Sequence, residues 1–251
     1  MRALGHHLTL GALAPLLPVM LVQGRRVRRT TPRVPDASGD PHGLVGEGAR
    51  TLRVAVIGES TVSGVGARSL ERGLPGRLAA ELAGAAGARV SWRAVGVNGI
   101  TAHRLIPVAM SGLAQDSLDL AFVALGVNDV LEFTGVSRWQ VDVEALCDML
   151  ARAAGASLVV LLGVPPMHRF PSLPQPLRAF LGTRARALDH ALGELARRRE
   201  RTLHVPTPAR GDLELYCEDR FHPSERGYAG WAAHVVAEIR PALVRQGIAA
   251  A

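Results

Sequence analysis

The chain has 251 residues, 48% of them hydrophobic, which is enough for one α/β domain with a substantial core and excludes an intrinsically disordered protein. Its formal net charge is +7, and all 29 basic side chains are arginine. Residues 1–33 hold six of these arginines and no acid, which leaves +1 (+7 less 6) on the remainder. The positive charge is therefore local to one end. No groove-reading motif accompanies it, and we do not expect the protein to bind nucleic acid.

The first predicted element is an uncharged apolar run over residues 8–22, LTLGALAPLLPVMLV, which the basic stretch QGRRVRR follows. The run is shorter than the roughly 20 residues that span a bilayer, and Pro15 and Pro18 interrupt it. Arginines that follow an apolar segment favour the cytoplasmic side. We therefore expect residues 1–29 to associate with or anchor to a membrane, with the folded domain in the cytoplasm. Export with removal of this segment is the alternative.

The Pro- and Gly-rich residues 30–50 are expected to be a linker, and residues 51–251 to form the folded domain. In that domain, short β-branched runs alternate with stretches of helical period. The predicted strands are 53–57, 90–95, 118–125, 157–163 and 202–205, and the predicted helices are 70–86, 102–115, 138–154, 176–199 and 224–246. Several strands are almost wholly apolar, which is typical of parallel strands covered on both faces. We therefore predict a flavodoxin-like, three-layer α/β/α sandwich around an approximately five-stranded parallel sheet.

Polar and glycine residues stand at the carboxyl ends of these strands, where open α/β sheets bind their ligands. The first strand ends in GES (58–60), the second in GVNG (96–99) and the third in GVND (126–129). A Pro-rich loop that begins at Pro165 follows the fourth strand, and DRFH (219–222) lies between the fifth strand and the last helix. These tips are the candidate functional positions.

Ser60 either caps the helix that follows it or acts as a nucleophile. A nucleophilic serine needs a base such as His222, whose second nitrogen needs an acceptor, and Asp219 stands three residues before it. On spacing alone, a polar surface loop over 219–222 is an equal alternative. A phosphate-binding loop needs a lysine that the chain lacks, and neither an H-E-x-x-H motif nor a Cys/His cluster indicates a metal site. The two cysteines are too few for a disulfide framework.

Gly99 and Asn128 are of the types that bind the oxyanion of an acyl-transfer intermediate. A glycine lets the backbone approach a ligand, and an Asn side chain supplies an amide donor. Taken singly, each position also fits a simple turn or a helix cap. Their joint occurrence at successive strand tips favours a functional site over a set of unrelated turns and caps.

The four blocks together resemble the SGNH, or GDSL-type, hydrolase family of esterases and lipases, which is named for Ser, Gly, Asn and His in that order. The resemblance covers about residues 52–246. It implies Ser60 as nucleophile, His222 as base and then acid, and Asp219 as the residue that orients His222. It also implies oxyanion donors from the Gly99 N–H, the Asn128 side chain and the Ser60 N–H. The first block of the family usually reads Gly-Asp-Ser, so Glu59 is a departure, and we do not expect it to be catalytic.

The implied activity is hydrolysis of a small carboxylic ester through an acyl-enzyme intermediate, without a metal or organic cofactor. Aromatic residues make up only 4% of the chain, which favours short-chain acyl or lipid-like esters over polysaccharide. The Pro-rich loop, with Met167, Phe170 and Leu173, either walls an acyl pocket or is a rigid surface connection. His103 and His168 are expected to be structural or surface residues.

Other functions remain open. Within the family, the alternatives are a carbohydrate O-acetylesterase, a lysophospholipase and a thioesterase. From other classes, the alternatives are a non-catalytic binding module on the same architecture and a flavodoxin-like cofactor or phosphate binder.

Overall fold

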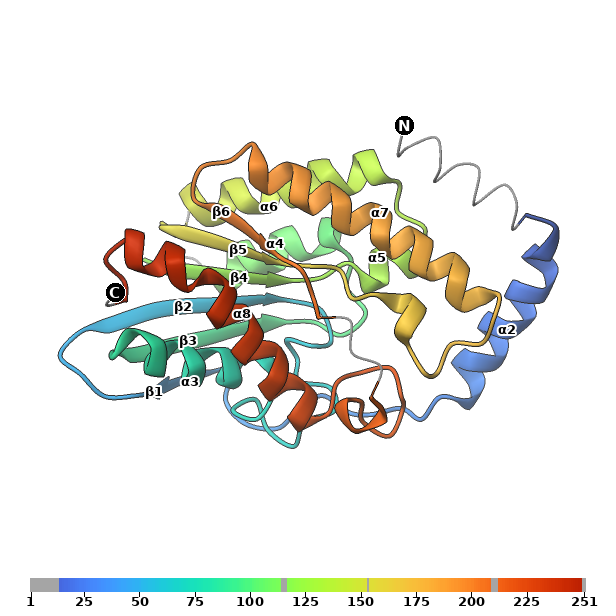
Figure 1. Ribbon diagram of the computed structural model, residues 1–251, viewed down its shortest axis with the longest axis horizontal. Helices are drawn as coiled ribbons and strands as arrows, with labels where there is room; N and C mark the ends of the chain where they lie inside the picture. Colours follow the sequence, from blue (N-terminus) through green and yellow to red (C-terminus); the bar gives the residue numbers. More distant parts are fainter. Residues whose placement is uncertain (1–13, 114–116, 153, 209–211, 250–251) are drawn as a thin grey trace.

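The computed structural model describes residues 14–113, 117–152, 154–208 and 212–249. A six-stranded sheet in the order β1-β3-β2-β4-β5-β6 forms its centre (Figure 1). The strands are β1 (His42–Val45), β2 (Thr51–Gly58), β3 (Arg89–Gly96), β4 (Leu120–Ala124), β5 (Leu158–Leu162) and β6 (Thr202–Val205). All pairings are parallel except that of β1 with β3. Counted from β2, the parallel strands follow the order 2-1-3-4-5 of flavodoxin-like folds.

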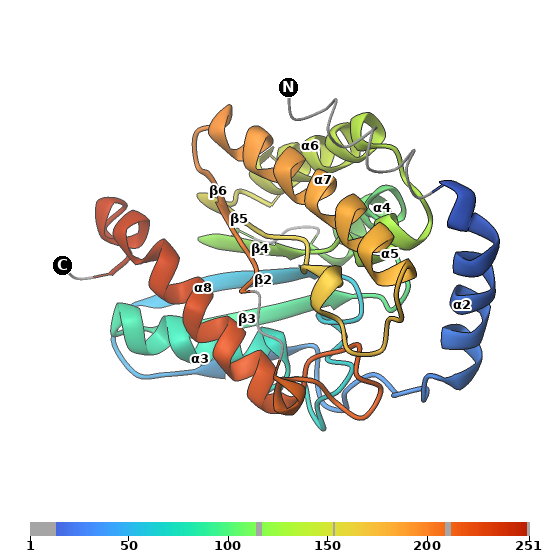
Figure 2. The same ribbon diagram turned by 45° about the vertical axis from the view of Figure 1, so that its right-hand side comes forward.

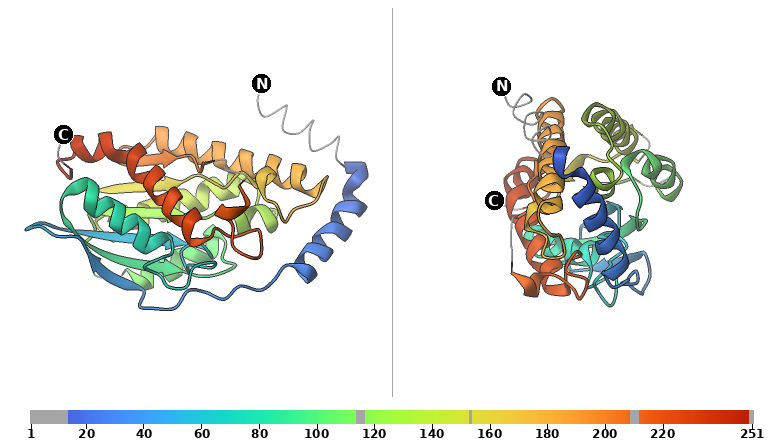
Figure 3. Two further views of the ribbon diagram at one scale, coloured as in Figure 1. Left: turned by 60° about the horizontal axis from the view of Figure 1, so that its bottom comes forward. Right: turned by 90° about the vertical axis from the view of Figure 1, so that its right-hand side faces the viewer.

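Helices cover both faces of the sheet, as the predicted three-layer sandwich requires (Figures 1 and 3). The helices α3 (Leu74–Ala86) and α8 (Glu225–Arg245) pack on one face, and α4 (Ala102–Gly112), α6 (Val136–Arg152) and α7 (Leu177–Arg197) pack on the other. The remaining helical segments are η1 (Ala14–Leu16), α2 (Leu17–Thr30), α5 (Val127–Leu131), η2 (Met167–Arg169) and η3 (Leu213–Leu215).

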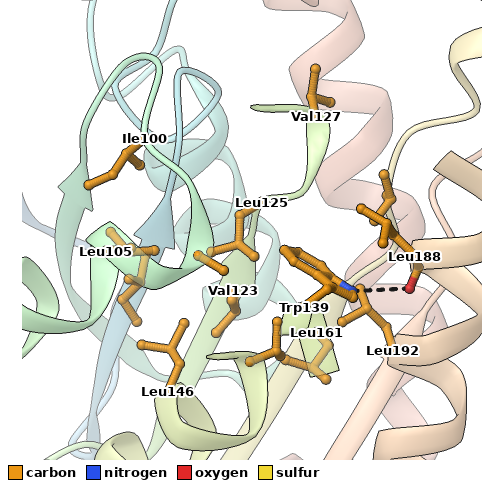
Figure 4. Packing of buried hydrophobic residues seen from close by; sticks show 14 of the residues in the cluster. Ile100, Leu105, Val123, Leu125, Val127, Trp139, Leu146, Leu161, Leu188 and Leu192 are labelled. Atoms are coloured by element: carbon orange, nitrogen blue, oxygen red, sulfur yellow. Dashed lines mark hydrogen bonds between the residues drawn. The ribbon is translucent and has the colours of Figure 1, made fainter. Parts of the chain in front are cut away.

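The central strands are buried on both faces, and their side chains alternate between two hydrophobic cores. Along β4, Leu120 and Phe122 face the α3/α8 core, whereas Ala121 and Val123 face the other core. Trp139 of α6 lies fully buried in this second core and donates its indole N–H to the carbonyl oxygen of Leu188 at 3.2 Å (Figure 4). The nearly continuous apolar runs in the sequence therefore reflect burial on both sides, as predicted.

An edge strand lies within residues 30–50, for which the sequence predicts only a linker. The four residues of β1 pair antiparallel with β3, from His42 opposite Arg93 to Val45 opposite Val90. A glycine is required within it, because a Cβ on Gly43 would lie 2.7 Å from the indole ring of Trp92. Gly43 lies within the strand and Gly46 directly follows it, and glycines so close together are typical of a loop, although Gly43 is what allows the strand to pack.

Two helices differ clearly from the prediction, one in where it begins and one in that a helix is present at all. The helix predicted from residue 70 begins at Leu74, with Pro75 in its first turn, where a missing N–H breaks no helical bond. The short helix α5 follows β4 where the sequence suggested a turn and a cap. The end of the helix predicted over 102–115 lies partly outside the described residues.

The helix α2 lies beyond the carboxyl ends of the parallel strands (Figures 1 and 2). It contains the end of the predicted apolar run and the arginines after it, while residues 8–13 of that run lie outside the described residues. In the part of the chain that the structure describes, no helix is both long enough and apolar enough to cross a bilayer.

Candidate active site

The candidate site lies at the carboxyl ends of β2 and β4, two neighbouring strands that are followed by helices on opposite faces of the sheet. β2 is followed by α3 on one face, and β4, its partner, is followed by α5 and α6 on the other. In open α/β sheets such a switch point forms a crevice at the carboxyl edge. Glu59 and Ser60 follow β2 at this point, and Asn128 follows β4.

Gly58 allows the two strand tips to approach each other. A Cβ at this position would lie 1.9 Å from the carbonyl oxygen of Ala124 in β4, so any other residue would push the strands apart. The same carbonyl oxygen accepts a hydrogen bond from the Glu59 N–H at 3.1 Å. The glycine of the first block is therefore a packing requirement that positions Ser60.

Ser60, His222 and Asp219 form one hydrogen-bonded chain. Ser60 Oγ lies 3.0 Å from His222 Nε2, and His222 Nδ1 lies 2.6 Å from Asp219 Oδ2. Ser60 and Asp219 are buried, and the side chain of His222 is 18% exposed. Residues 162 positions apart in the sequence thus lie in contact. The geometry is that of an activated serine, with the base between the hydroxyl and a carboxylate.

A tight turn holds the carboxylate of Asp219. Its Oδ1 accepts the backbone N–H groups of Phe221 and His222 at 2.8 and 2.9 Å, and Arg220, which directly follows Asp219, adopts a left-handed conformation (φ +57°). Burial raises the pKa of Asp219, but the hydrogen bonds from the His222 side chain and backbone outweigh it and lower the pKa to about 2. An ionised Asp219 keeps the proton on His222 Nδ1, which leaves the Nε2 lone pair directed at Ser60.

Cys217 is a further support for this carboxylate, and it was not among the site residues predicted from the sequence. Its Sγ lies 3.1 Å from Asp219 Oδ1. Burial raises the pKa of the Cys217 thiol to about 12, so the group stays protonated and acts as a donor. Its place two residues before Asp219 on the same short loop was the available signal.

Glu59 faces the tip of β4 rather than Ser60. Its Oε1 accepts the N–H of Val127 at 3.1 Å, and its Oε2 accepts both the N–H of Asn128 at 3.1 Å and the side-chain Nδ2 of Asn128 at 2.6 Å. Burial raises the pKa of Glu59 to about 7, although these hydrogen bonds oppose the rise. Glu59 thus fixes the start of α5 and the orientation of the Asn128 amide.

Three donors of the kind that bind an oxyanion stand at the tips of the adjacent strands β3, β2 and β4. The Asn128 amide nitrogen carries two hydrogens, of which Glu59 takes one. Gly99 stands in the turn after β3, the neighbour of β2, with φ +80°, a conformation that favours glycine. Among the described residues, the backbone N–H groups of Ser60 and Gly99 donate to no protein acceptor. Each can therefore serve an incoming ligand.

A largely apolar cavity of about 90 Å³ adjoins Ser60 and His222. Its walls include Pro165 and Phe170 of the Pro-rich loop and Trp231 of α8. The Phe170 ring contacts the rings of Phe221 and Tyr216 edge-on, at centroid distances of 4.9 and 5.9 Å. Of the three apolar side chains that the sequence offered for this wall, Phe170 lines the cavity. All three belong to the hydrophobic core, and Met167 and Leu173 do not line the cavity.

His103 and His168, the other two histidines considered in the sequence, have partners outside the hydrogen-bonded set of Ser60, His222 and Asp219. His103 Nδ1 lies 3.3 Å from Asp142 Oδ1, and His168 lies beside Arg186. The described residues contain no group of three His, Cys, Asp or Glu side chains that could hold a metal ion.

Comparison with known proteins identifies the family of the chain. A family model described as the GDSL-like lipase/acylhydrolase family matches residues 56–229, and the chain belongs to that family. The chain is 29% identical over 204 residues to the GDSL-like esterase Rv1075c of Mycobacterium tuberculosis, a match that covers 78% of this chain and 64% of that protein. It therefore spans less than two thirds of the length of this curated relative.

Solved structures show the same fold. The lipase Lip_vut3 from a goat rumen metagenome matches with a TM-score of 0.57 and 20% identity, over 74% of this chain and 96% of that one. The esterase EstA from Pseudoalteromonas sp. matches with a TM-score of 0.58 and 16% identity, over 76% and 98%. At these identities the likeness extends to the architecture alone.

Proposed function

We propose that the protein hydrolyses carboxylic esters through an acyl-enzyme intermediate on Ser60. The observation that carries this proposal is the continuous chain of hydrogen bonds from Ser60 through His222 to Asp219. Membership of the GDSL-like lipase/acylhydrolase family and the esterase name of the Mycobacterium tuberculosis relative support it.

In the first step, Ser60 Oγ attacks the ester carbonyl carbon while His222 Nε2 takes the hydroxyl proton. The negative charge moves to the carbonyl oxygen, where the Asn128 amide and the N–H groups of Ser60 and Gly99 bind it. The intermediate then expels the alcohol, whose oxygen receives the proton from His222. The ionised Asp219 stabilises the imidazolium between these two transfers.

In the second step, water repeats the sequence with the acyl-enzyme as the substrate. His222 takes a proton from the water as its oxygen attacks the acyl carbon. Collapse of the second intermediate returns the proton to Ser60 Oγ and releases the carboxylic acid. Every proton transfer uses the same nitrogen, which is why one well-oriented histidine suffices.

The proposed substrates are short-chain acyl or lipid-like esters. The cavity beside Ser60 is lined by proline, phenylalanine and tryptophan side chains, and such a surface favours an apolar acyl group over a sugar. A carbohydrate O-acetylesterase, a lysophospholipase and a thioesterase use the same chemistry and differ in the leaving group. A panel of acetyl, butyryl and longer acyl esters beside a lysophospholipid separates them.

The proposal is tested by Ser60→Ala, with Ser63→Ala as the matched control. Both serines are buried and stand three residues apart in the same segment. Ser60→Ala is expected to lower the hydrolysis of a short-chain chromogenic ester by a factor on the order of 10³ or more, and to abolish labelling by a fluorophosphonate probe. Ser63→Ala is expected to retain both ester hydrolysis and labelling by the probe. Hydrolysis and labelling that survive in Ser60→Ala would remove Ser60 from the reaction, and an unlabelled wild-type protein would favour a non-catalytic binding module.

A further inference from the structure

The helix α2 is held against the domain along a single stripe. Met20 is buried in the hydrophobic core and Val27 packs against it, seven positions further along the helix. Between them, the side chain of Gln23 donates to the carbonyl oxygen of Gln175 at 2.5 Å and accepts the N–H of Leu177 at 3.2 Å. Because these contacts tie α2 to the start of α7, its outer surface has a defined orientation relative to the domain.

The outer surface of α2 is apolar in its first half and basic in its second half. Val19, Leu21 and Val22 are 47%, 57% and 64% exposed. The second half exposes Arg25, Arg26, Arg28 and Arg29, and the helix contains no acidic residue. Within the described part of the chain, none of these four arginines forms an ion pair with a carboxylate. An exposed apolar surface flanked by unpaired arginines is the pattern of a segment that lies at the surface of a lipid bilayer.

Other exposed apolar side chains lie on the same edge of the molecule as α2. Val97 follows β3, Phe133 follows α5 and Leu213 lies between β6 and α8, so that all three belong to connections that leave the carboxyl ends of strands. Figures 1 and 2 show α2 and α5 at this end of the sheet. Of the fourteen large apolar side chains that are exposed among the described residues, ten belong to η1, to α2 or to these connections: Leu16, Leu17, Val19, Leu21, Val22, Val97, Leu131, Phe133, Val136 and Leu213. Such a concentration distinguishes this edge from the rest of the surface.

Phe133 is the most distinctive of these side chains. It is 58% exposed and adopts φ +59°, a left-handed conformation that is rare for an aromatic residue. The guanidinium of Arg184 lies 4.9 Å from its ring centroid, and the ring of Phe180 lies 6.0 Å away. An exposed ring held in a strained backbone conformation points to a contact outside the molecule.

We propose that this edge docks on an anionic lipid surface, with α2 as its principal contact. The apolar half of α2 enters the boundary between headgroups and acyl chains, and its arginines bind lipid phosphates. The arginines specify the occupant, because a zwitterionic bilayer has no net negative charge to attract them and an uncharged apolar protein surface would leave them without partners. The candidate active site then faces the bilayer. The docking itself does not depend on the proposed hydrolysis.

The test measures sedimentation of the full-length chain with phosphatidylcholine vesicles that contain or lack phosphatidylglycerol. We expect binding to the anionic vesicles only, and weaker binding as salt is added. Arg25→Gln and Arg29→Gln together are expected to weaken this binding by roughly fivefold per arginine. The matched control replaces Arg240 and Arg245 at the far end of α8, which are also exposed, and it binds as the wild type does.

A second pair of variants tests the apolar contact. Leu21→Gln with Val22→Gln is expected to reduce binding, while Leu44→Gln, which alters an equally exposed side chain on β1, leaves it unchanged. All of these variants hydrolyse a soluble short-chain ester as the wild type does, and Ser60→Ala still binds vesicles. A failure of docking is thereby distinguished from a failure of the proposed chemistry.

Three results would overturn the proposal. The first is equal binding to neutral and anionic vesicles. The second is equal binding by the α2 variants and their controls. The third is a loss of self-association in the α2 variants, measured by light scattering, without a change in vesicle binding, because α2 would then contact a second copy of the chain.

Discussion

At the scale of single residues, Glu59 is the side chain whose role depends most on its length. It stands next to the proposed nucleophile, yet its carboxylate reaches the tip of β4 and accepts the N–H groups of Val127 and Asn128 as well as the Asn128 side chain. An aspartate at this position would be one methylene shorter. Glu59 is therefore a positioning residue that acts through Asn128.

Glu59→Gln tests this role. The glutamine amide turns one acceptor into a donor that faces N–H groups, so we expect the Asn128 side chain to lose its orientation. In the proposed reaction, the oxyanion donor acts in the transition state. The variant should therefore lower kcat by a factor on the order of 10–10² with little change in KM.

A double-mutant cycle separates positioning from a general loss of structure. In an Asn128→Ala background, Glu59→Gln should have a much smaller effect on kcat, because the group it positions is gone. Asp142→Asn, which removes another buried carboxylate on α6, is the matched control and should leave kcat near that of the wild type. Additive effects of the Glu59 and Asn128 substitutions would contradict the role assigned to Glu59.

At the scale of secondary structure elements, the close pairing of β2 with β4 sets the width of the site. Gly58 and Ala124 are partners in the ladder, and the chain leaves the two strands toward opposite faces just beyond them. Three of the four segments that carry the proposed catalytic and oxyanion residues stand at strand tips, so small shifts of a strand move functional groups directly. A packing defect at Gly58 should therefore affect both stability and activity.

Gly58→Ala places a Cβ 1.9 Å from the Ala124 carbonyl oxygen, a contact that only a backbone shift relieves. We expect the free energy of unfolding to fall by about 2–4 kcal/mol, and ester hydrolysis to fall with it at temperatures where the variant is folded. Chemical denaturation and initial rates measure the two effects.

Gly84→Ala is the control for that experiment. Gly84 lies on the exposed side of α3, and a Cβ there meets nothing within 4 Å. This substitution should raise the free energy of unfolding by about 0.5–1 kcal/mol, because alanine is the better helix former. If Gly58→Ala were as stable as Gly84→Ala, the close approach of β2 and β4 would not be required.

At the scale of the whole molecule, the proposed site couples to global stability through the titration of Glu59. Burial raises the pKa of Glu59 from 4.5 to about 7. Between these two values the folded protein holds a proton that the unfolded chain releases, so the free energy of unfolding contains a contribution that is fully present below about pH 4.5 and is lost as the pH rises through about 7.

This contribution is expected to be roughly 3 kcal/mol, and Glu59→Gln should abolish it. Urea unfolding at about pH 5 and about pH 8 measures the difference. The wild-type protein should lose more stability between these two conditions than Glu59→Gln does. Identical losses in the two proteins would show that the buried carboxyl group does not titrate in this range.

Much of the fold and of the candidate site could be predicted because it is encoded locally. Wholly apolar runs such as that of β5 are typical of strands buried on both faces, and GES, GVNG and GVND stand at the ends of predicted strands. In contrast, β1 was not predicted, because its four residues lie in a segment rich in proline and glycine and are held by pairing with β3. The role of Glu59 was not predicted either, because it depends on the strand tip opposite.

The sequence by itself determined the parallel strands, the residue types at their tips and the chemistry those types permit, since hydrophobic periodicity and turn residues act over a few positions. Only the tertiary structure decided that Ser60 meets His222 across 162 positions, that Glu59 turns toward Asn128, and that α2 lies at the same edge of the sheet. These contacts arise from the order of strands and the packing of two cores. Their free energy is distributed over many residues that are far apart in the chain, so no local pattern records them.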